Sequence, residues 1–339
     1  VYKYRDCVIR SFNDDKPFDQ FVVEQLAGDE LLTPPFENLI PEQAEKLVAT
    51  GFLRMAPDGT GVGGIDQNLA RNDVMTKTIE IVSTSLLGLT VGCAQCHNHR
   101  YDPISHEDYH AFRAIFEPSL DWKNWLVPAK HLVSLYTDAD RAKSAEIEAD
   151  AQKILNERTK KQDEYIEATF QRELVKLEEG LREPINVARN TPDKERTPAQ
   201  QKLLKEHPSV NVSAGSLYLY DKKAADELKE MADKANDIRK QKPKEEFVRA
   251  VWEPVGKTPP ATFLFHRGDH EQPKQEVAPR ELTVLASART VELSTKRDEL
   301  PTSGRRLAYA RWLTSGEHPL TARVIVNRMW LNHFGQGIV

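Results

Sequence analysis

The chain has 339 residues, with 47 Lys and Arg, 52 Asp and Glu, and three cysteines. The formal charge of -5 is small for this length, so neither a nucleic acid nor an anionic membrane surface is expected as a partner. Three cysteines exclude a disulfide framework, and a composition of 39% hydrophobic and 29% charged residues argues against wholesale disorder. The length corresponds to about two domains, or to one domain with an insertion.

No stretch is apolar over the ~20 residues that a membrane-spanning helix requires, so no transmembrane segment is expected in this chain. The best candidate, residues 79–91, is interrupted by Glu80. No basic and apolar leader follows Val1, so we expect no targeting peptide within this sequence. The ending at residues 335–339 is typical of a chain that stops partway, and we interpret the sequence as a piece of a longer protein.

Residues 1–137 have a mixed composition and are predicted to be helical. Residues 19–26 carry apolar side chains on one side, and Pro41 opens a second helix with proline in its first turn. The glycine-rich loop at 55–64 lacks the Lys-Ser/Thr pair of a phosphate-binding loop, so we interpret it as an irregular surface loop. A longer helix is predicted at 71–89, where apolar residues recur at three- and four-residue steps.

Residues 138–246 are dense in charged residues and poor in aromatic ones, and they are predicted to form a helical hairpin. Two apolar stripes support it: Ile166, Phe170, Leu174, Leu177 and Leu181, then Ala225, Leu228, Met231, Ala235 and Ile238. Such narrow stripes predict an antiparallel pair joined by a connection at 184–208. The charged faces are interpreted as solvated, and docking of a partner on this hairpin is the functional alternative.

Residues 247–339 are predicted to be the start of a C-terminal domain, one that is incomplete here. Short strands are predicted at 261–266 and 281–288, with a turn at Arg267-Gly268-Asp269 after the first strand. Helices are predicted at 304–313 and 321–334, the second with Gly335 as its C-terminal cap. The predicted fold class is therefore mainly α: a helical first domain, an inserted charged hairpin and a small α+β C-terminal part.

The run Cys93-Ala94-Gln95-Cys96-His97 matches the CxxCH pattern of c-type haem attachment. Two thiols three positions apart reach the two vinyl groups of one porphyrin, and the adjacent imidazole then ligates the iron. With three Cys and ten His in 339 residues, chance produces this pattern about once in a thousand such sequences. We therefore predict a covalent haem c on Cys93 and Cys96, with His97 as the proximal ligand.

Two other interpretations of the same residues remain open. Cys93, Cys96, His97 and His99 form a potential zinc or other metal site, in a structural or interaction protein. Zinc, however, usually takes its ligands from two separated clusters, and no second cysteine pair exists because Cys7 stands alone. A CxxC redox pair is the third interpretation, although the βαβ context of such pairs is missing.

The residues after the motif have possible roles at the edge of the cofactor. Arg100 is a candidate partner for a haem propionate. Asp102 is a candidate for orienting His97 or His99. Arg100 and Asp102 are explained equally well as ordinary residues of the turn.

The sixth ligand of the iron is the least determined part of the site. We rank His333 first, because its helical face predicts that it points inward, Met55 second and an open position third. His106 and His110, one turn apart on a helix predicted at 105–116, are interpreted as a partly exposed pair. Met75 is about 27 Å from Cys93 along a straight helix and is a poor candidate.

Whether the chain is an enzyme stays undecided at this point. No Gly-x-Ser-x-Gly elbow occurs. The run at 106–110, His-Glu-Asp-Tyr-His, has the His-Glu-x-x-His spacing, but we interpret its two histidines as a partly exposed pair and predict no hydrolytic or transfer motif. With a sixth ligand, a haem at this motif would transfer electrons. With an open position, it would bind a small molecule or turn over peroxide.

Long runs of this sequence resemble a known family pair. Residues 1–118 resemble the planctomycete cytochrome c-like family, in the runs YRDCVIRSFN at 4–13, EQLAGD at 24–29 and LGLTVGCAQCHNHRYDPI at 87–104. Residues from about 261 resemble the planctomycete cytochrome-associated C-terminal domain, in RGD at 267–269, GRRLA at 304–308 and NRMWLNHFG at 327–335. The charged hairpin corresponds to the variable spacer between them.

The resemblance implies an exported protein with a covalent haem, located in the periplasm or at the cell surface. Members of this family usually carry further chain before Tyr4 and after Val339, where a haem ligand or part of the pocket is also expected. The family has no established activity, and its links to carbohydrate breakdown and respiration are associations only. A redox partner protein is implied, but its identity is unknown.

Overall fold

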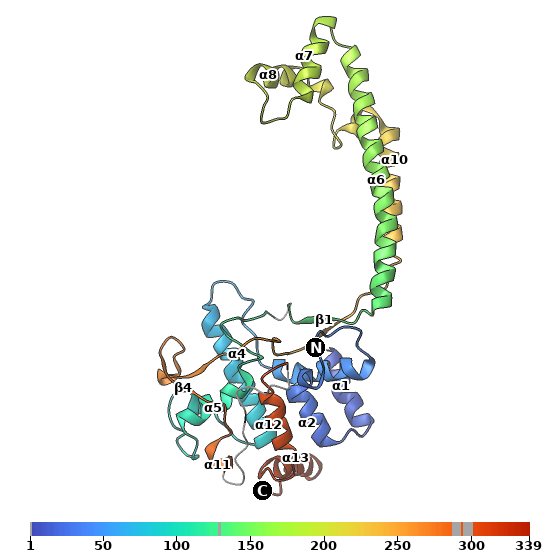
Figure 1. Ribbon diagram of the computed structural model, residues 1–339. Coiled ribbons are helices and arrows are strands. Elements are labelled where there is room, and N and C mark those ends of the chain that lie inside the picture. The colour runs from blue at the N-terminus through green and yellow to red at the C-terminus, as the bar shows by residue number, and fades with distance from the viewer. Residues whose placement is uncertain (1, 128–129, 287–292, 294–300) are drawn as a thin grey trace. The chain divides into compact units, whose positions relative to one another are not determined.

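The computed structural model describes residues 2–127, 130–286, 293 and 301–339. It is mainly α-helical with two small antiparallel sheets, which confirms the predicted fold class. The chain divides into two compact units, one formed by residues 1–137 with 245–339 and the other by Asp138–Lys244 (Figure 1). Residues 247–339, predicted as the start of a separate domain, therefore pack in the same unit as the first 137 residues.

The helices described in the first unit confirm most of the predicted ones. They are α1 (Tyr2–Asn13), α2 (Phe18–Ala27), α3 (Pro41–Ala49), α4 (Gln67–Val82), α5 (His106–Phe116), α11 (Thr283–Ala286), α12 (Arg305–Leu313) and α13 (Thr321–Phe334). Shorter turns are η1 (Asp29–Leu31), η2 (Thr50–Arg54), the π-helical η3 (Ser83–Leu87), η4 (Gly92–Gln95) and η7 (His266–Gly268). Asp66 caps α4 and Ser105 caps α5 through side-chain oxygens, and Gly335 ends α13 in the left-handed conformation.

Each sheet has two antiparallel strands. β1 (Leu132–Ser134) pairs with β2 (Phe247–Arg249), and β3 (Thr262–Phe265) pairs with β4 (Pro273–Val277). The strand predicted at 281–288 is wrong, because residues 283–286 form the helical turn α11, while 287 and 288 lie outside the described residues. Leu282 and Leu285 are both buried at helical spacing, and Asp108 accepts hydrogen bonds from the backbone and hydroxyl of Thr283.

The core of the first unit lies between α2, α4, α5 and α12. Its largest fully buried apolar side chains include Met75, Ile79, Tyr109, Phe112 and Tyr309. The rings of Phe112 and Tyr309 meet edge to face with centroids 5.4 Å apart. The helix that follows the CxxCH run, α5, is thus fixed by packing against a C-terminal helix.

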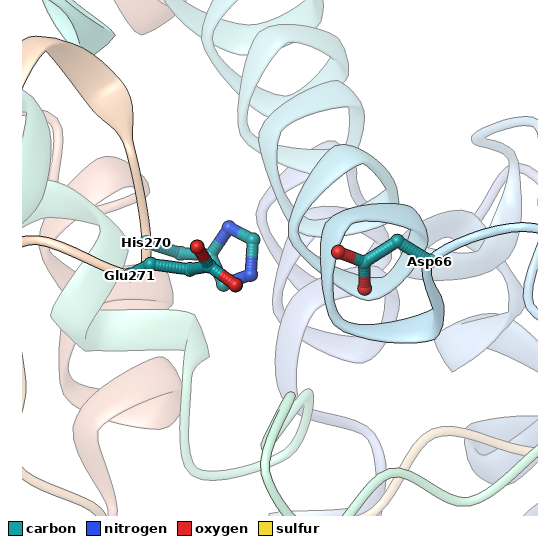
Figure 2. A group of neighbouring side chains, drawn as sticks. All are labelled: Asp66, His270 and Glu271. Carbon is teal, nitrogen blue, oxygen red and sulfur yellow. The ribbon is translucent and has the colours of Figure 1, made fainter.

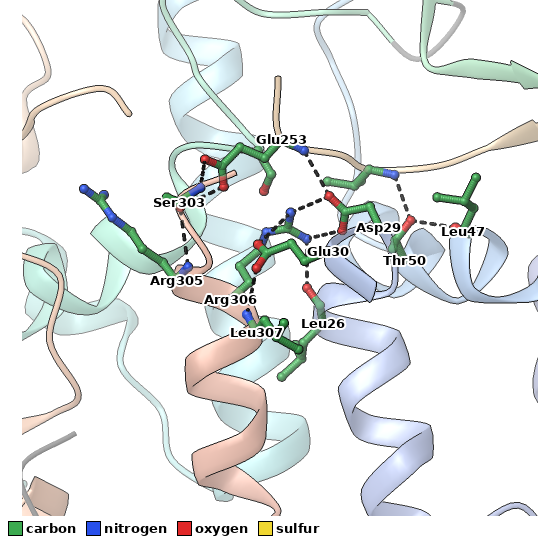
Figure 3. A network of polar contacts seen from close by, with 12 residues as sticks. Leu26, Asp29, Glu30, Leu47, Thr50, Glu253, Ser303, Arg305, Arg306 and Leu307 are labelled. Atoms are coloured by element: carbon green, nitrogen blue, oxygen red, sulfur yellow. Dashed lines mark hydrogen bonds and ion pairs between the residues drawn. The ribbon is translucent and has the colours of Figure 1, made fainter. Parts of the chain in front are cut away.

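A buried ionic network joins the two ends of the sequence (Figure 3). The Arg306 guanidinium donates to both carboxylate oxygens of Asp29, at 2.8 and 2.7 Å, and lies 3.2 Å from Glu30. The backbone N–H of Glu253 donates to Asp29, and its carboxylate accepts from the backbone N–H and the hydroxyl of Ser303. Three carboxylates and one guanidinium therefore lie together out of water, where they are stabilised by one another, by backbone groups and by the Ser303 hydroxyl.

The second unit is a helical hairpin with a folded tip. Its elements are α6 (Asp138–Val175), α7 (Glu179–Asn190), α8 (Pro198–Glu206), η6 (Pro208–Val210), α9 (Leu217–Tyr220) and α10 (Lys222–Arg239). α6 and α10 lie side by side, and Ile166 of the first predicted stripe packs with Leu228 of the second (Figure 1). The rest of the first stripe packs in the tip instead. The connection predicted at 184–208 is more regular than expected, because it contains most of α7 and all of α8, and Ile185 there packs with Phe170 and Leu174 of α6.

Among the described residues, no helix combines the length and the apolar character needed to cross a membrane.

Candidate functional site

The CxxCH run begins on η4, a 3-10 turn between η3 and α5, and its last two residues, Cys96 and His97, follow that turn. Val91 and Ala94 are completely buried and anchor the turn in the core. Cys93 and Cys96 are both free and exposed. The local sequence therefore separates two functions, since the apolar positions hold the turn and the two thiols face solvent.

His97 is exposed, and its ring is oriented by a backbone group. Its Nδ1 lies 2.7 Å from the carbonyl oxygen of Asn98. A carbonyl oxygen only accepts, so Nδ1 is the donor in this contact, which leaves Nε2 as the ring nitrogen able to ligate a metal. The Asn98 side chain accepts from the backbone N–H of His106, which ties this segment to the start of α5.

His99 closes the turn that follows the motif. Its Nδ1 accepts from the backbone N–H of Asp102 at 2.9 Å, and its own backbone N–H donates to the carbonyl of Ile104. Its side chain is 7% exposed, and the Asp102 carboxylate lies 3.3 Å from Nδ1. We expected Asp102 to orient His97 or His99, and the structure shows its contact with His99.

Arg100, predicted to meet a haem propionate, is exposed. Its guanidinium carbon lies 5.8 Å from the ring centroid of Tyr101, which is itself 84% exposed. This pair of exposed side chains leaves the guanidinium accessible to an anionic group from solvent.

The histidine pair on α5 is less exposed than predicted. His110 is completely buried, and its Nε2 lies 3.3 Å from the carbonyl of Gln95 within the motif. Burial, with Arg113 and His106 nearby, lowers the pKa of His110 to about 3. The ring is therefore neutral at neutral pH and supports the motif from the core side. It meets the Phe265 ring edge to face, with the ring centroids 5.2 Å apart.

The turn after β3 packs against the second cysteine. A Cβ placed on Gly268 would lie 2.7 Å from Cys96 Sγ, and Gly268 has a φ of +76°. Asp269 holds this turn by accepting from the backbone N–H of Glu271 and the side chain of Gln272. The Arg267-Gly268-Asp269 run, predicted only as a turn, thus lies directly beside the CxxCH motif.

The same turn contributes to a group of potential metal ligands (Figure 2). Donor atoms of Asp66, His270 and Glu271 lie within 4.8 Å of one another. Asp66 Oδ1 already caps α4 by accepting from two backbone N–H groups at 2.8 and 3.2 Å. The His270 ring packs edge to face with Trp122, with the ring centroids 5.5 Å apart. No spacing in the sequence indicates this group, because Asp66 is more than 200 positions from the other two.

The predicted zinc ligands Cys93, Cys96, His97 and His99 do not converge in the same way. Within the part of the chain that the structure describes, no three of their donor atoms lie within 4.8 Å of one another. Cys93, Cys96 and His97 are exposed whereas the His99 side chain is 7% exposed, and Nδ1 of both histidines is engaged by backbone.

The two predicted sixth ligands lie elsewhere. The expectation that His333 points inward is wrong: its side chain is exposed on α13, with Nδ1 2.7 Å from the Met329 carbonyl of its own helix. Met55 is 52% exposed and lines a cavity with Arg54 and Arg249, to which none of the CxxCH residues contributes.

Comparison with known proteins gives two family matches. Residues 1–121 match PSCyt2, described as a protein of unknown function (DUF1549), and residues 305–339 match PSD1, described as a protein of unknown function (DUF1553). Together they support a planctomycete cytochrome-associated family. No curated protein and no solved structure gives a significant match to the chain.

Proposed function

We propose that this planctomycete cytochrome-associated protein is a mono-haem c-type redox protein. The haem would be held by thioether bonds to Cys93 and Cys96, with His97 as the proximal ligand. The observation that carries the proposal is the geometry of residues 93–97, where two free thiols and one imidazole, whose Nδ1 contacts a backbone carbonyl, are all exposed within five positions.

The residues present fit this cofactor. The backbone acceptor on His97 Nδ1 fixes the tautomer and raises the basicity of Nε2, which is the usual arrangement of a metal-binding imidazole. Cys7, in contrast, is 1% exposed on α1, and burial with the nearby Glu45 raises its pKa to about 12. The two motif cysteines are therefore the accessible thiols of this chain.

A haem bound there would supply one-electron chemistry at iron. This chain would hold it, orient its proximal ligand and leave Arg100 for a propionate. Because covalent haem attachment takes place outside the cytoplasm, we place the protein in the periplasm or at the cell surface. Its role is then electron transfer with a redox partner, or peroxide or small-molecule chemistry if the iron has an open position.

The test is covalent haem in the purified protein. Expressed with a c-type haem attachment system, the chain is expected to show a c-type alkaline pyridine haemochrome spectrum and one haem of added intact mass. Cys93→Ala/Cys96→Ala removes both signals, whereas Cys7→Ala retains them. A wild-type chain without covalent haem, or a double variant that still carries it, contradicts the proposal.

A second candidate function is a metal-binding interaction protein with a zinc-type divalent ion at Asp66, His270 and Glu271. One observation favours it: an imidazole and two carboxylates converge within 4.8 Å, which is a donor set suited to such ions. The predicted alternative of zinc on Cys93, Cys96, His97 and His99 lacks this convergence.

Elemental analysis separates the two functions. One zinc per chain without iron favours the second, provided that the zinc persists in Cys93→Ala/Cys96→Ala and is lost in His270→Gln. His266→Gln, in the same turn, is the matched control and is expected to keep the ion. Asp66→Asn weakens zinc binding while its amide oxygen still caps α4.

A further inference from the structure

A cavity of about 460 Å³ lies in the first unit, away from the CxxCH motif. Its walls come from the start of α1, from the η2 region and from the ribbon of β1 and β2. Cavities of this size hold small organic molecules. None of the residues of the proposed haem site lines it.

The charged lining of this cavity is mainly cationic. Arg54, Arg249 and Lys3 line it, Lys3 is paired with Glu246, and Asp58 is the one carboxylate among the lining residues. Arg54 Nη2 donates to Asp58 at 2.8 Å, whereas its Nη1 is buried without a hydrogen-bond partner. Burial lowers the pKa of Arg54. The charge of Asp58 raises this pKa, and the charge of Arg249 lowers it. Two guanidinium groups thus repel each other at a site with a single counter-charge.

Arg54 is held firmly in place. Its guanidinium carbon lies 5.8 Å from the ring centroid of Trp125. Asp58 is fixed in turn by the backbone N–H and hydroxyl of Thr60, and Thr60 accepts from Trp125 Nε1 at 3.1 Å. The free Nη1 is therefore a preorganised donor.

His131 adds a second buried polar atom without a partner. It is 6% exposed, it lines the cavity, and its Nδ1 has no hydrogen bond. Burial, and then the charge of Arg54, lowers the pKa of His131 to about 4, so the ring is neutral at pH 7. Its edge contact with Trp252, at 4.8 Å between centroids, fixes its orientation. A buried polar nitrogen left unpaired is costly, and a ligand able to hydrogen-bond to it removes the cost.

The rim of the cavity is apolar and exposed. Tyr2, Met55, Leu132 and Phe247 line it and are 63%, 52%, 41% and 41% exposed. Strand pairing explains part of this arrangement, because Leu132 lies opposite Arg249 and Phe247 lies two residues before it, on the same face of the ribbon. The cavity therefore combines cationic groups with an exposed apolar wall.

We propose that this cavity binds a small organic acid, with its carboxylate on Arg54 and Arg249 and its apolar body between Met55, Leu132 and Phe247. Guanidinium groups match the planar carboxylate, and the anion relieves their mutual repulsion. Met55, which we predicted as a haem ligand, lines the proposed organic-acid site instead. The inference is independent of the haem proposal, because the two sites share no residue.

Isothermal titration of the full chain with benzoate tests the proposal. Benzamide is the matched neutral ligand, and inorganic phosphate is the matched anion without an apolar body. Saturable benzoate binding at one per chain is expected, at least about tenfold tighter than benzamide or phosphate. No saturable benzoate binding, or equal binding of benzoate and benzamide, overturns the proposal.

Two variants locate the site. Arg249→Gln is expected to weaken benzoate at least about tenfold and to leave benzamide unchanged, since the lost interaction is with the carboxylate. Arg311→Gln, an exposed arginine outside the cavity, is the control and leaves benzoate binding unchanged. Phe247→Ala weakens benzoate severalfold without affecting phosphate. If phosphate binds as tightly as benzoate and Phe247→Ala has no effect, the site takes a bare anion and the proposal fails.

Discussion

Asp29 and Arg306 form a bidentate ion pair in the core although they are 277 residues apart in the chain. The Arg306 side chain is fully buried, and Asp29 is 2% exposed. Asp29 ends the EQLAGD run and Arg306 lies within GRRLA, so two runs that carry the family resemblance meet at this pair (Figure 3). The pair is one reason why residues 245–339 fold with the first 137.

Removing one partner of this pair is expected to destabilise the first unit strongly. Arg306→Met leaves Asp29 and Glu30 buried without their cation, and the free energy of unfolding should fall by about 3–5 kcal/mol. Urea unfolding followed by circular dichroism measures it. Arg311→Gln on the exposed side of α12 is the control and should change stability by less than about 0.5 kcal/mol. Equal effects of the two substitutions would show that the ion pair contributes little.

Glu30 makes stability depend on pH in an unusual direction. Burial raises its pKa from 4.5 to about 7, against the attraction of Arg306. Between these two pH values the folded state keeps a proton that the unfolded state has lost, so this contribution to stability falls as pH rises from 4.5 to 7. We expect the stability of the wild type relative to Glu30→Gln to decrease over that range and to level off above pH 7. Urea unfolding of both proteins at pH 5, 6, 7 and 8 checks it, and a constant difference contradicts it.

Gly268 is expected to control the environment of Cys96. In Gly268→Ala the new methyl group clashes with Cys96 Sγ, in addition to the cost of about 1–2 kcal/mol for a left-handed alanine. Gly256→Ala is the matched control, because Gly256 also has a positive φ but no atom within 4 Å of an added Cβ. Rates of iodoacetamide labelling at Cys96, read by mass spectrometry, should change only in Gly268→Ala. The same rate in both variants would refute the contact.

The charged hairpin is expected to be dispensable for folding of the first unit. Its two chain ends leave the β1–β2 ribbon next to each other, where Leu135 N–H donates to the Glu246 carbonyl at 2.8 Å. Replacing residues 138–244 by a short Gly-Ser linker should therefore keep the melting temperature of the first unit within a few degrees. Differential scanning calorimetry measures it. Loss of the cooperative transition would mean that the hairpin contributes to the core of the first unit.

Helix positions were predictable because they depend on local pattern. The apolar residues Met75, Ile79 and Val82 recur at helical spacing, and all three are buried on α4. The strand predicted at 281–288 failed because short apolar runs have no decisive period. There the side chain of Asp108, far away in sequence, caps a helical turn instead.

Local sequence pattern is enough to predict the mainly helical fold, the charged hairpin and the CxxCH run, since each depends on residues within a few positions of one another. The side chains that surround these elements are set by tertiary packing. The pairing of Asp29 with Arg306, the contact of Gly268 with Cys96, and the meeting of Arg54 and Arg249 at one cavity all join positions about 170 or more residues apart. Such contacts arise from the packing of whole helices and strands, and no local spacing rule encodes them.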